Sequence, residues 1–168
     1  NQFAPKLIRN GAPVNLMDRP DDYILDRDLV DEAIGWIHTQ QAADEDKPFF
    51  VYIAPGTAHS PHQAPAEWIA RFEGAFDQGW DKLREESFER QKAMGIIPEN
   101  AELTPRPDVV PAWDSLSEDE QRVQARYMEV FCAMLAYQDY QFGRLLDELD
   151  RMGVSDDTLI MFIQGDNG

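Results

Sequence analysis

The chain has 168 residues, of which 43% are hydrophobic and 11% aromatic, so its composition is that of one folded globular domain rather than a disordered segment. Its formal net charge of −17 argues against nucleic acid and against an anionic membrane surface as partners, although a local cation could still hold a small anionic substrate. A single cysteine excludes an internal disulfide framework, and no stretch approaches the roughly 20 apolar residues of a membrane span.

The first 25 residues are polar and rich in turn-forming residues. Within them, Asn10-Gly11 favours a type I′ turn, which requires positive φ at both central residues. Residues 6–14 are therefore predicted to form a small hairpin, and Pro13 marks its second arm as an edge strand.

A helix followed by a strand is predicted next. Residues 26–43 repeat apolar side chains at helical spacing and begin with acidic residues in the first turn. Residues 49–54 form a short, continuous apolar run, which predicts a central parallel strand covered on both faces. A loop that contains His59 and His62 follows this predicted strand.

Residues 66–114 are predicted to be an excursion from the sheet. Short helices are expected at 67–72 and 80–94, and the second of these is heavily charged. An extended loop is expected after them, because its prolines disfavour helix.

A long helix is predicted to start at one of two overlapping capping boxes, Ser115 with Glu118 or Ser117 with Glu120. It should end at Gly153, and roughly 35 residues at about 1.5 Å each make a rod of about 50 Å. One apolar stripe runs along it and is expected to pack in the core: Val123, Tyr127, Val130, Met134, Tyr137, Phe142, Leu145, Leu146 and Leu149.

The chain ends in an apolar run, 158–163, followed by Gly165-Asp166-Asn167-Gly168. This completes a strand, helix, strand order, which predicts an α/β fold with a mostly parallel sheet flanked by helices. Because chemistry in such sheets sits at the carboxyl ends of strands, the two post-strand loops are the candidate sites.

The His59 loop and the Asp166-Asn167 pair each allow two interpretations. A histidine can donate a hydrogen bond to an anion or a proton to a leaving oxygen, but a loop histidine can equally be satisfied by backbone. A zinc site from His59 and His62 is weakly supported, because Pro61 between them biases the loop toward extended geometry. Asp166 and Asn167 offer the hard oxygen donors that Ca²⁺ or Mg²⁺ prefers, while Asn-Gly is also a turn signal.

Three segments together resemble the sulfatase family, in particular bacterial arylsulfatases. They are, in chain order, PFFVYIAP at 48–55, AHSPHQAP at 58–65, and TLIMFIQGDNG at 158–168. The resemblance continues through 76–84, 113–116 and 128–130, and it covers nearly the whole chain from about residue 20 onward.

The resemblance implies an alkaline-phosphatase-like α/β fold and hydrolysis of a small-molecule sulfate ester. By this resemblance His59 is catalytic and contacts the sulfate, while Asp166 and Asn167 are ligands of Ca²⁺, with Mg²⁺ as second choice. The family's nucleophile is a formylglycine made from a Cys-x-Pro-x-Arg type motif. Cys132 lacks that context, so the nucleophile is expected outside this chain.

The chain is accordingly interpreted as a middle segment, residues 1–168, of a sulfatase catalytic domain. Its parts are an irregular start with a hairpin (1–25), a helix, strand and histidine loop (26–65), the excursion (66–114), and the long helix with the last strand (115–168). This segment alone is expected to be inactive. The alternatives are a phosphonate or phosphodiester hydrolase of the same superfamily, or a truncated, inactive interaction module. Compartment and oligomeric state are left open.

Overall fold

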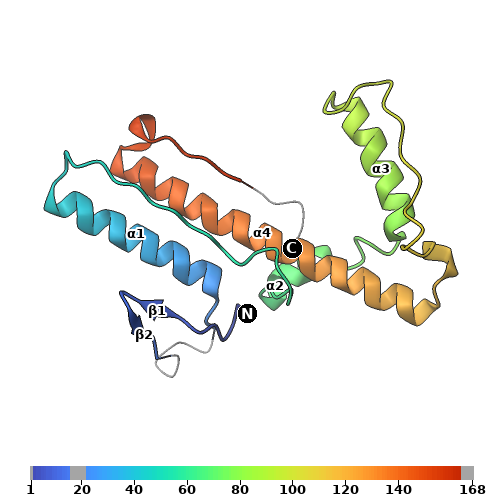
Figure 1. The fold of residues 1–168 in the computed structure, drawn as a ribbon, viewed down its shortest axis with the longest axis horizontal. Coiled ribbons are helices and arrows are strands. Elements are labelled where there is room, and N and C mark those ends of the chain that lie inside the picture. The colour runs from blue at the N-terminus through green and yellow to red at the C-terminus, as the bar shows by residue number, and fades with distance from the viewer. Residues whose placement is uncertain (1, 16–21, 164–168) are drawn as a thin grey trace.

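The structure, a computed structural model, describes residues 2–15 and 22–163 (Figure 1). No helix in these ranges is long and apolar enough to cross a membrane. The elements are β1 (Ile8–Arg9), β2 (Ala12–Pro13), α1 (Leu25–Ala43), α2 (Ala66–Ile69), α3 (Gly79–Ala93) and α4 (Glu118–Met152), with 3₁₀ turns η2 (Ala70–Phe72), η3 (Trp113–Ser115) and η4 (Ser155–Asp157).

The predicted hairpin is confirmed. Strands β1 and β2 pair antiparallel, with Ile8 opposite Pro13. Asn10 and Gly11 have φ angles of 51° and 83°, as a type I′ turn requires.

Helix α4 begins at the second of the two predicted capping boxes. The Ser117 hydroxyl accepts the Glu120 backbone N–H at 3.3 Å, and the Glu120 carboxylate accepts the Ser117 backbone N–H at 2.8 Å. The helix runs for 35 residues and ends at Gly153, whose φ of 72° is the left-handed C-cap conformation. The predicted end is therefore confirmed, and the start is the second of the two alternatives that the sequence offered.

Helices α1 and α4 lie side by side and build the main core. They run in the same direction over the second half of α4 (Figure 1). Apolar side chains meet between them because each helix carries them at i, i+3, i+4 and i+7 spacing. The buried members are Val30, Ile37, Leu145 and Leu149.

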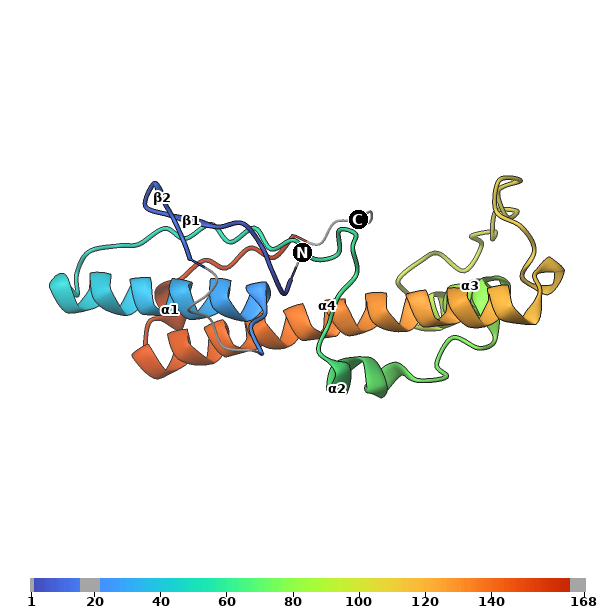
Figure 2. The ribbon, with the colours of Figure 1, turned by 90° about the horizontal axis from the view of Figure 1, so that it is seen from below.

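Two extended segments cover one side of this helix pair. Residues 49–54 and 158–163 run in the same direction, toward the middle of α4 (Figures 1 and 2). Phe49, Val51 and Ile53 pack on the core, while the alternate side chains Phe50 and Tyr52 are 82% and 81% exposed. The prediction that 49–54 is covered on both faces is therefore wrong within the described residues: one face is covered.

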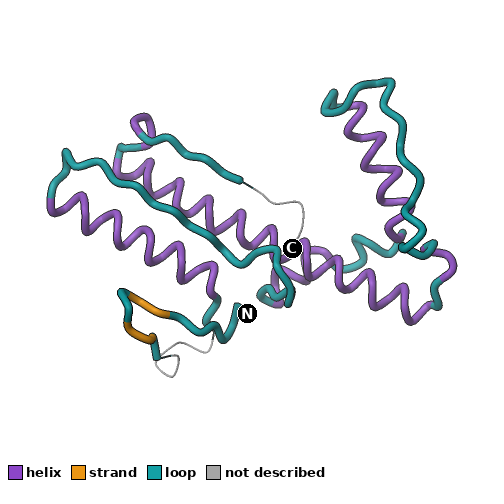
Figure 3. The backbone as a smooth tube through the Cα atoms, viewed as in Figure 1, coloured by secondary structure: helices purple, strands orange, loops and turns teal. Residues whose placement is uncertain are grey.

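The predicted parallel sheet remains a prediction. In the described part of the chain, hydrogen-bonded strands occur in the β1–β2 hairpin, and the two extended segments are drawn as loop (Figure 3). Burial alternates along residues 49–54 with the two-residue period of a strand that has one buried face, whereas the apolar side chains of residues 159–163 are all exposed.

The apolar stripe of α4 is buried only in part. Met134, Tyr137, Leu145 and Leu149 are in the core, as predicted. Val123, Tyr127 and Leu146 are 51%, 61% and 39% exposed, so the prediction is wrong for these three. The reason for the first two is geometric: α4 is much longer than α1, so its first half extends beyond the α1–α4 contact toward α3 (Figure 1).

The excursion folds onto the other parts of α4. The helices predicted at 67–72 and 80–94 are present as α2 with η2 and as α3. A second buried cluster joins α2 and η2 to α4 through Ala64, Ala133 and Met134. A hydrogen bond also links this region to α4: the carboxylate of the buried Glu129 accepts the Gly74 backbone N–H at 2.8 Å.

Candidate functional site

The loop after residues 49–54 presents His59 at the surface. A turn closes at this residue, where the backbone N–H of His59 donates to the Gly56 carbonyl at 2.8 Å. The ring Nδ1 lies 2.6 Å from the Ser60 carbonyl, and since a carbonyl only accepts, Nδ1 must carry the proton. Among the described residues, His59 Nε2 makes no hydrogen bond to another protein group.

A buried polar network lies beneath the same loop. The Thr57 hydroxyl donates to Asp26 Oδ2 at 2.6 Å, and Asp26 is only 3% exposed. Gln2 joins both, because its Nε2 donates to Thr57 Oγ1 at 3.3 Å and its Oε1 accepts the Asp26 backbone N–H at 3.1 Å. The Gln2 backbone N–H donates to Gln63 Oε1 at 2.8 Å. The network thus ties the start of α1 to both sides of His59.

Thr57→Val is expected to destabilise the fold by about 1–3 kcal/mol, because it removes the hydroxyl that donates to a buried carboxylate. Urea unfolding followed by circular dichroism measures this free energy. The matched control is Thr39→Val, whose exposed hydroxyl donates to the Gly35 carbonyl and should change stability by less than about 0.5 kcal/mol. Equal values for the two variants would show that the network does not hold the loop.

His62 has a different setting from His59. Its ring packs edge-on against Phe131 of α4, with ring centres 5.1 Å apart. Across the described ranges, no group of three or more His, Cys, Asp or Glu side chains is placed to hold a metal ion. The His62 ring is therefore part of an aromatic contact with α4.

Asp166 and Asn167 lie outside the described residues. Their assignment as metal ligands stays a prediction, as does the catalytic role of His59. Their donor set of one carboxylate and one carboxamide suits a hard cation such as Ca²⁺.

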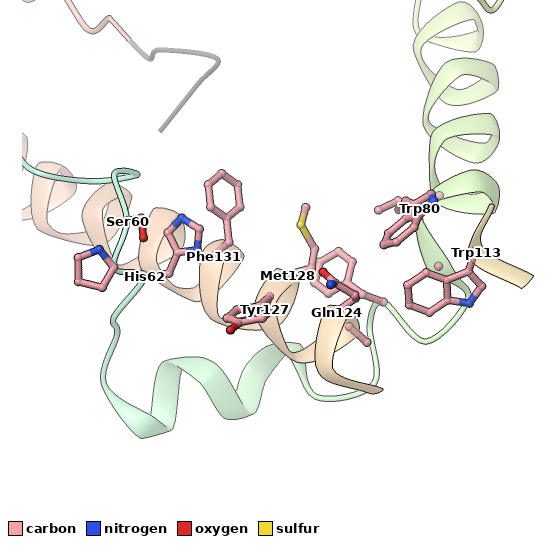
Figure 4. Close-up of a pocket in the computed structure, with 13 residues that line it drawn as sticks. Ser60, His62, Trp80, Trp113, Gln124, Tyr127, Met128 and Phe131 are labelled. Atoms are coloured by element: carbon pink, nitrogen blue, oxygen red, sulfur yellow. The ribbon is translucent and has the colours of Figure 1, made fainter. Parts of the chain in front are cut away.

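A cavity of about 790 Å³ adjoins the His59 loop. Ser60 and His62 from the loop line one side of it, Trp80 and Trp113 line the other, and Tyr127 of α4 lies between them (Figure 4). Its wall thus begins at the residue that directly follows His59 in the chain.

Four contacts hold Trp113 in this wall, two of them to its ring and two to its backbone. Gly79 makes room for it, since a Cβ at Gly79, where φ is +77°, would lie 2.2 Å from the Trp113 ring. Asp81 Oδ2 accepts the Trp113 backbone N–H at 2.9 Å, and Gln121 Nε2 donates to the Trp113 carbonyl at 3.0 Å. Trp80 stacks edge-on against Trp113 with ring centres 4.8 Å apart.

Low pH is expected to weaken the contact that holds Trp113 in the cavity wall, because it protonates the Asp81 carboxylate. The Trp113 backbone N–H, together with Arg106 at 2.9 Å, holds the pKa of the Asp81 carboxyl below its ordinary value. A lowered pKa means that the stabilisation is present above the unfolded-state pKa of about 3.9 and is lost as pH falls below it. In the wild type, tryptophan fluorescence should change as the pH falls below about 3.9. Asp81→Asn should show the altered signal already at neutral pH, whereas the surface control Asp119→Asn should behave as the wild type does.

The sequence did not reveal this cavity. Trp80 and Trp113 are 33 positions apart, and no local pattern predicts that they meet. The only available signal was the pair of resembling segments at 76–84 and 113–116.

Cys132 lies within α4 and is partly buried. Burial raises the pKa of its thiol, which keeps the sulfur protonated and poorly nucleophilic. This environment agrees with the interpretation that Cys132 is not the nucleophile.

Comparison with known proteins identifies the family. The family model described as Sulfatase matches residues 2–168. An arylsulfatase from Klebsiella aerogenes is 34% identical over 166 residues, which are 99% of this chain and 34% of that protein. An uncharacterized sulfatase from Schizosaccharomyces pombe is 36% identical over 126 residues, which are 74% of this chain and 23% of that protein. The chain belongs to the sulfatase family.

Family membership confirms the coarse predictions from sequence. The sulfatase family has an alkaline-phosphatase-like α/β fold, and its members hydrolyse sulfate esters. The chain spans about a third of the Klebsiella aerogenes arylsulfatase and less of the Schizosaccharomyces pombe protein.

Proposed function

We propose that this chain is part of an enzyme that hydrolyses small-molecule sulfate esters, and that it supplies a proton donor and part of a calcium site. The observation that carries the proposal is the His59 loop. An exposed imidazole with its Nδ1 proton already committed to a carbonyl follows an extended segment of a sulfatase-family chain.

His59 is suited to assist the departure of the alcohol. With Nδ1–H bonded to the Ser60 carbonyl, a second proton on the ring resides on Nε2. That N–H can donate to the bridging ester oxygen, on which negative charge develops as the bond to sulfur breaks. The network under Thr57 limits the movement of the loop, so the ring requires little reorganisation.

Asp166 and Asn167 would hold Ca²⁺ through their side-chain oxygens, with Mg²⁺ as a second choice. When bound, the ion supplies positive charge against the sulfate oxygens. Such charge would let a chain with a net charge of −17 accept an anionic substrate.

We place the nucleophile, a formylglycine, outside these 168 residues. The partly buried helical position of Cys132 supports this placement. The 168-residue chain assayed alone should therefore show no turnover of an aryl sulfate with added Ca²⁺, and robust turnover would contradict the placement.

Ester selectivity of the full-length protein tests the reaction class. The expected result is a kcat/KM for 4-nitrophenyl sulfate above the values for 4-nitrophenyl phenylphosphonate and bis(4-nitrophenyl) phosphate. The opposite order would favour a phosphonate or phosphodiester hydrolase of the same superfamily. No turnover of any of the three would favour an inactive interaction module.

A further inference from the structure

We propose that Gln2 is a positioning residue for His59, because its hydrogen bonds hold the His59 loop on both sides of the imidazole. This inference rests on the proposed function for the role of His59 as a proton donor. It goes further in assigning a role in the reaction to a residue that lies 55 positions before Thr57 in the sequence.

Gln2 lies at the centre of the buried network beneath the loop, and it is only 3% exposed. Each of its four polar groups has a protein partner. The backbone N–H donates to Gln63 Oε1 at 2.8 Å, and the carbonyl accepts the Leu25 backbone N–H at 2.8 Å. The side-chain Oε1 accepts the Asp26 backbone N–H at 3.1 Å, and Nε2 donates to Thr57 Oγ1 at 3.3 Å. One buried residue therefore connects the start of α1 to the segments before and after the candidate proton donor.

The partners of Gln2 fix the orientation of its amide. A carboxylate only accepts hydrogen bonds, so the Thr57 hydroxyl must donate its proton to Asp26 Oδ2 at 2.6 Å. The hydroxyl oxygen is then an acceptor for Gln2 Nε2, while the Asp26 backbone N–H can only donate to Gln2 Oε1. Turning the amide over would place an N–H donor against the Asp26 N–H. The network therefore has one consistent arrangement, and both ends of the Gln2 amide take part in it.

The burial of Asp26 makes the position of Thr57 energetically important. Asp26 is 3% exposed, and in the described part of the chain its second oxygen, Oδ1, is buried without a hydrogen-bond partner. The Thr57 hydroxyl thus donates to a carboxylate that is removed from water, and moving the hydroxyl away would leave that buried charge unpaired, which is costly. Gln2 bonds the same hydroxyl, so the chain is held two positions before His59.

The chain is held again on the other side of the imidazole. Gln63 lies four positions after His59, and its side-chain oxygen accepts the Gln2 backbone N–H. Between these two points the ring is bonded to the loop itself, because the Ser60 carbonyl lies 2.6 Å from Nδ1. The ring is thus fixed relative to the loop, and the loop relative to Gln2. Because misplacing a reacting group by about 1 Å can lower a rate by about 100-fold, loss of the Gln2 hydrogen bonds should reduce catalysis through His59.

The test is Gln2→Met in the full-length protein, which keeps the length of the side chain and removes both of its hydrogen-bonding groups. For hydrolysis of phenyl sulfate, kcat should fall about 10-fold to 100-fold, with KM changed by less than about twofold. In a His59→Ala background the same substitution should lower kcat by less than about twofold further, because Gln2 acts through the missing ring. The matched control is Gln41→Met at the other end of α1, where the amide donates to the Lys47 carbonyl at 3.4 Å. It should leave kcat unchanged.

A second measurement needs no turnover. Long-range ¹H–¹⁵N NMR of the full-length protein labelled with ¹⁵N-histidine reports which ring nitrogen carries the proton. The His59 signals, identified by their loss in His59→Ala, should show the neutral ring with its proton on Nδ1 in the wild type. In Gln2→Met they should change toward an average of the two tautomers. Gln63→Met removes the partly buried acceptor of the Gln2 backbone N–H and should change them in the same direction, and circular dichroism checks that each variant is folded.

The outcomes separate this proposal from the proposed function. His59 signals that change in Gln2→Met but not in Gln41→Met support the positioning role, even if the wild type turns over no sulfate ester. Unchanged His59 signals in Gln2→Met, or in Gln63→Met should Gln2→Met fail to fold, would overturn it, even if the protein is a sulfatase. A kcat loss in Gln2→Met that is equally large in the His59→Ala background would also overturn it, because Gln2 would then act independently of His59.

Discussion

Replacing His59 by alanine in the full-length protein is expected to lower kcat for sulfate ester hydrolysis by about 10²–10⁴-fold. The loss should grow as the leaving alcohol becomes less acidic, because a poor leaving group depends more on proton donation from Nε2. Steady-state kinetics with 4-nitrophenyl, phenyl and benzyl sulfates measures this dependence.

The matched control is His38→Ala, which removes an imidazole from α1 that bonds Glu148 at 2.7 Å, away from the His59 loop. It should leave the kinetics unchanged. A His59→Ala variant whose rate loss is the same for all three esters would argue against proton donation and for a role in sulfate binding alone. An unchanged rate would return His59 to a loop histidine satisfied by backbone.

Replacing Asp166 by alanine is expected to weaken Ca²⁺ binding by more than about 100-fold, since loss of even an outer-shell partner costs 10–100-fold. Calorimetric titration of the full-length protein with Ca²⁺ gives the affinity, independently of turnover. Activity should fall in parallel and recover in part at high Ca²⁺ concentration.

Asp156→Ala serves as the control for this experiment. Asp156 lies in η4, before the last extended segment, and is not among the proposed ligands. It should bind Ca²⁺ as the wild type does. Unchanged Ca²⁺ affinity in Asp166→Ala would favour the turn interpretation of Asp166-Asn167-Gly168.

The local elements were predictable because their signals are local. Asn10-Gly11 determines the hairpin turn, Ser117 with Glu120 caps α4, and Gly153 ends it. Each depends on side chains within a few positions of the backbone groups they satisfy. The boundaries of α1, α3 and α4 therefore agree with prediction within one or two residues.

It was less predictable which apolar faces are covered by segments that are distant in the sequence. Tyr127 fits the apolar stripe of α4, yet it is exposed, because burial depends on which element lies opposite each turn of the helix. Phe50 and Tyr52 likewise lie on a face that no described element covers. Periodicity shows that a helix or strand has an apolar face, but the partner of that face depends on tertiary packing.

In the candidate site, too, the features with a local sequence signal were predictable and those that depend on distant contacts were not. His59 could be selected from sequence because it follows an apolar strand-like run in a family-specific segment. The Asp26–Thr57 network and the Trp113 wall depend on contacts between distant segments. None of these contacts leaves a pattern in the local sequence.

The most direct test of the sulfatase assignment is release of sulfate from 4-nitrophenyl sulfate by the full-length protein, before and after treatment with a chelator. The expected result is hydrolysis that stops when metal is removed and returns when Ca²⁺ is added back. Hydrolysis that continues at full rate without metal would contradict a calcium site at Asp166 and Asn167. Absence of sulfate release from the Ca²⁺-loaded protein would contradict the proposed reaction itself.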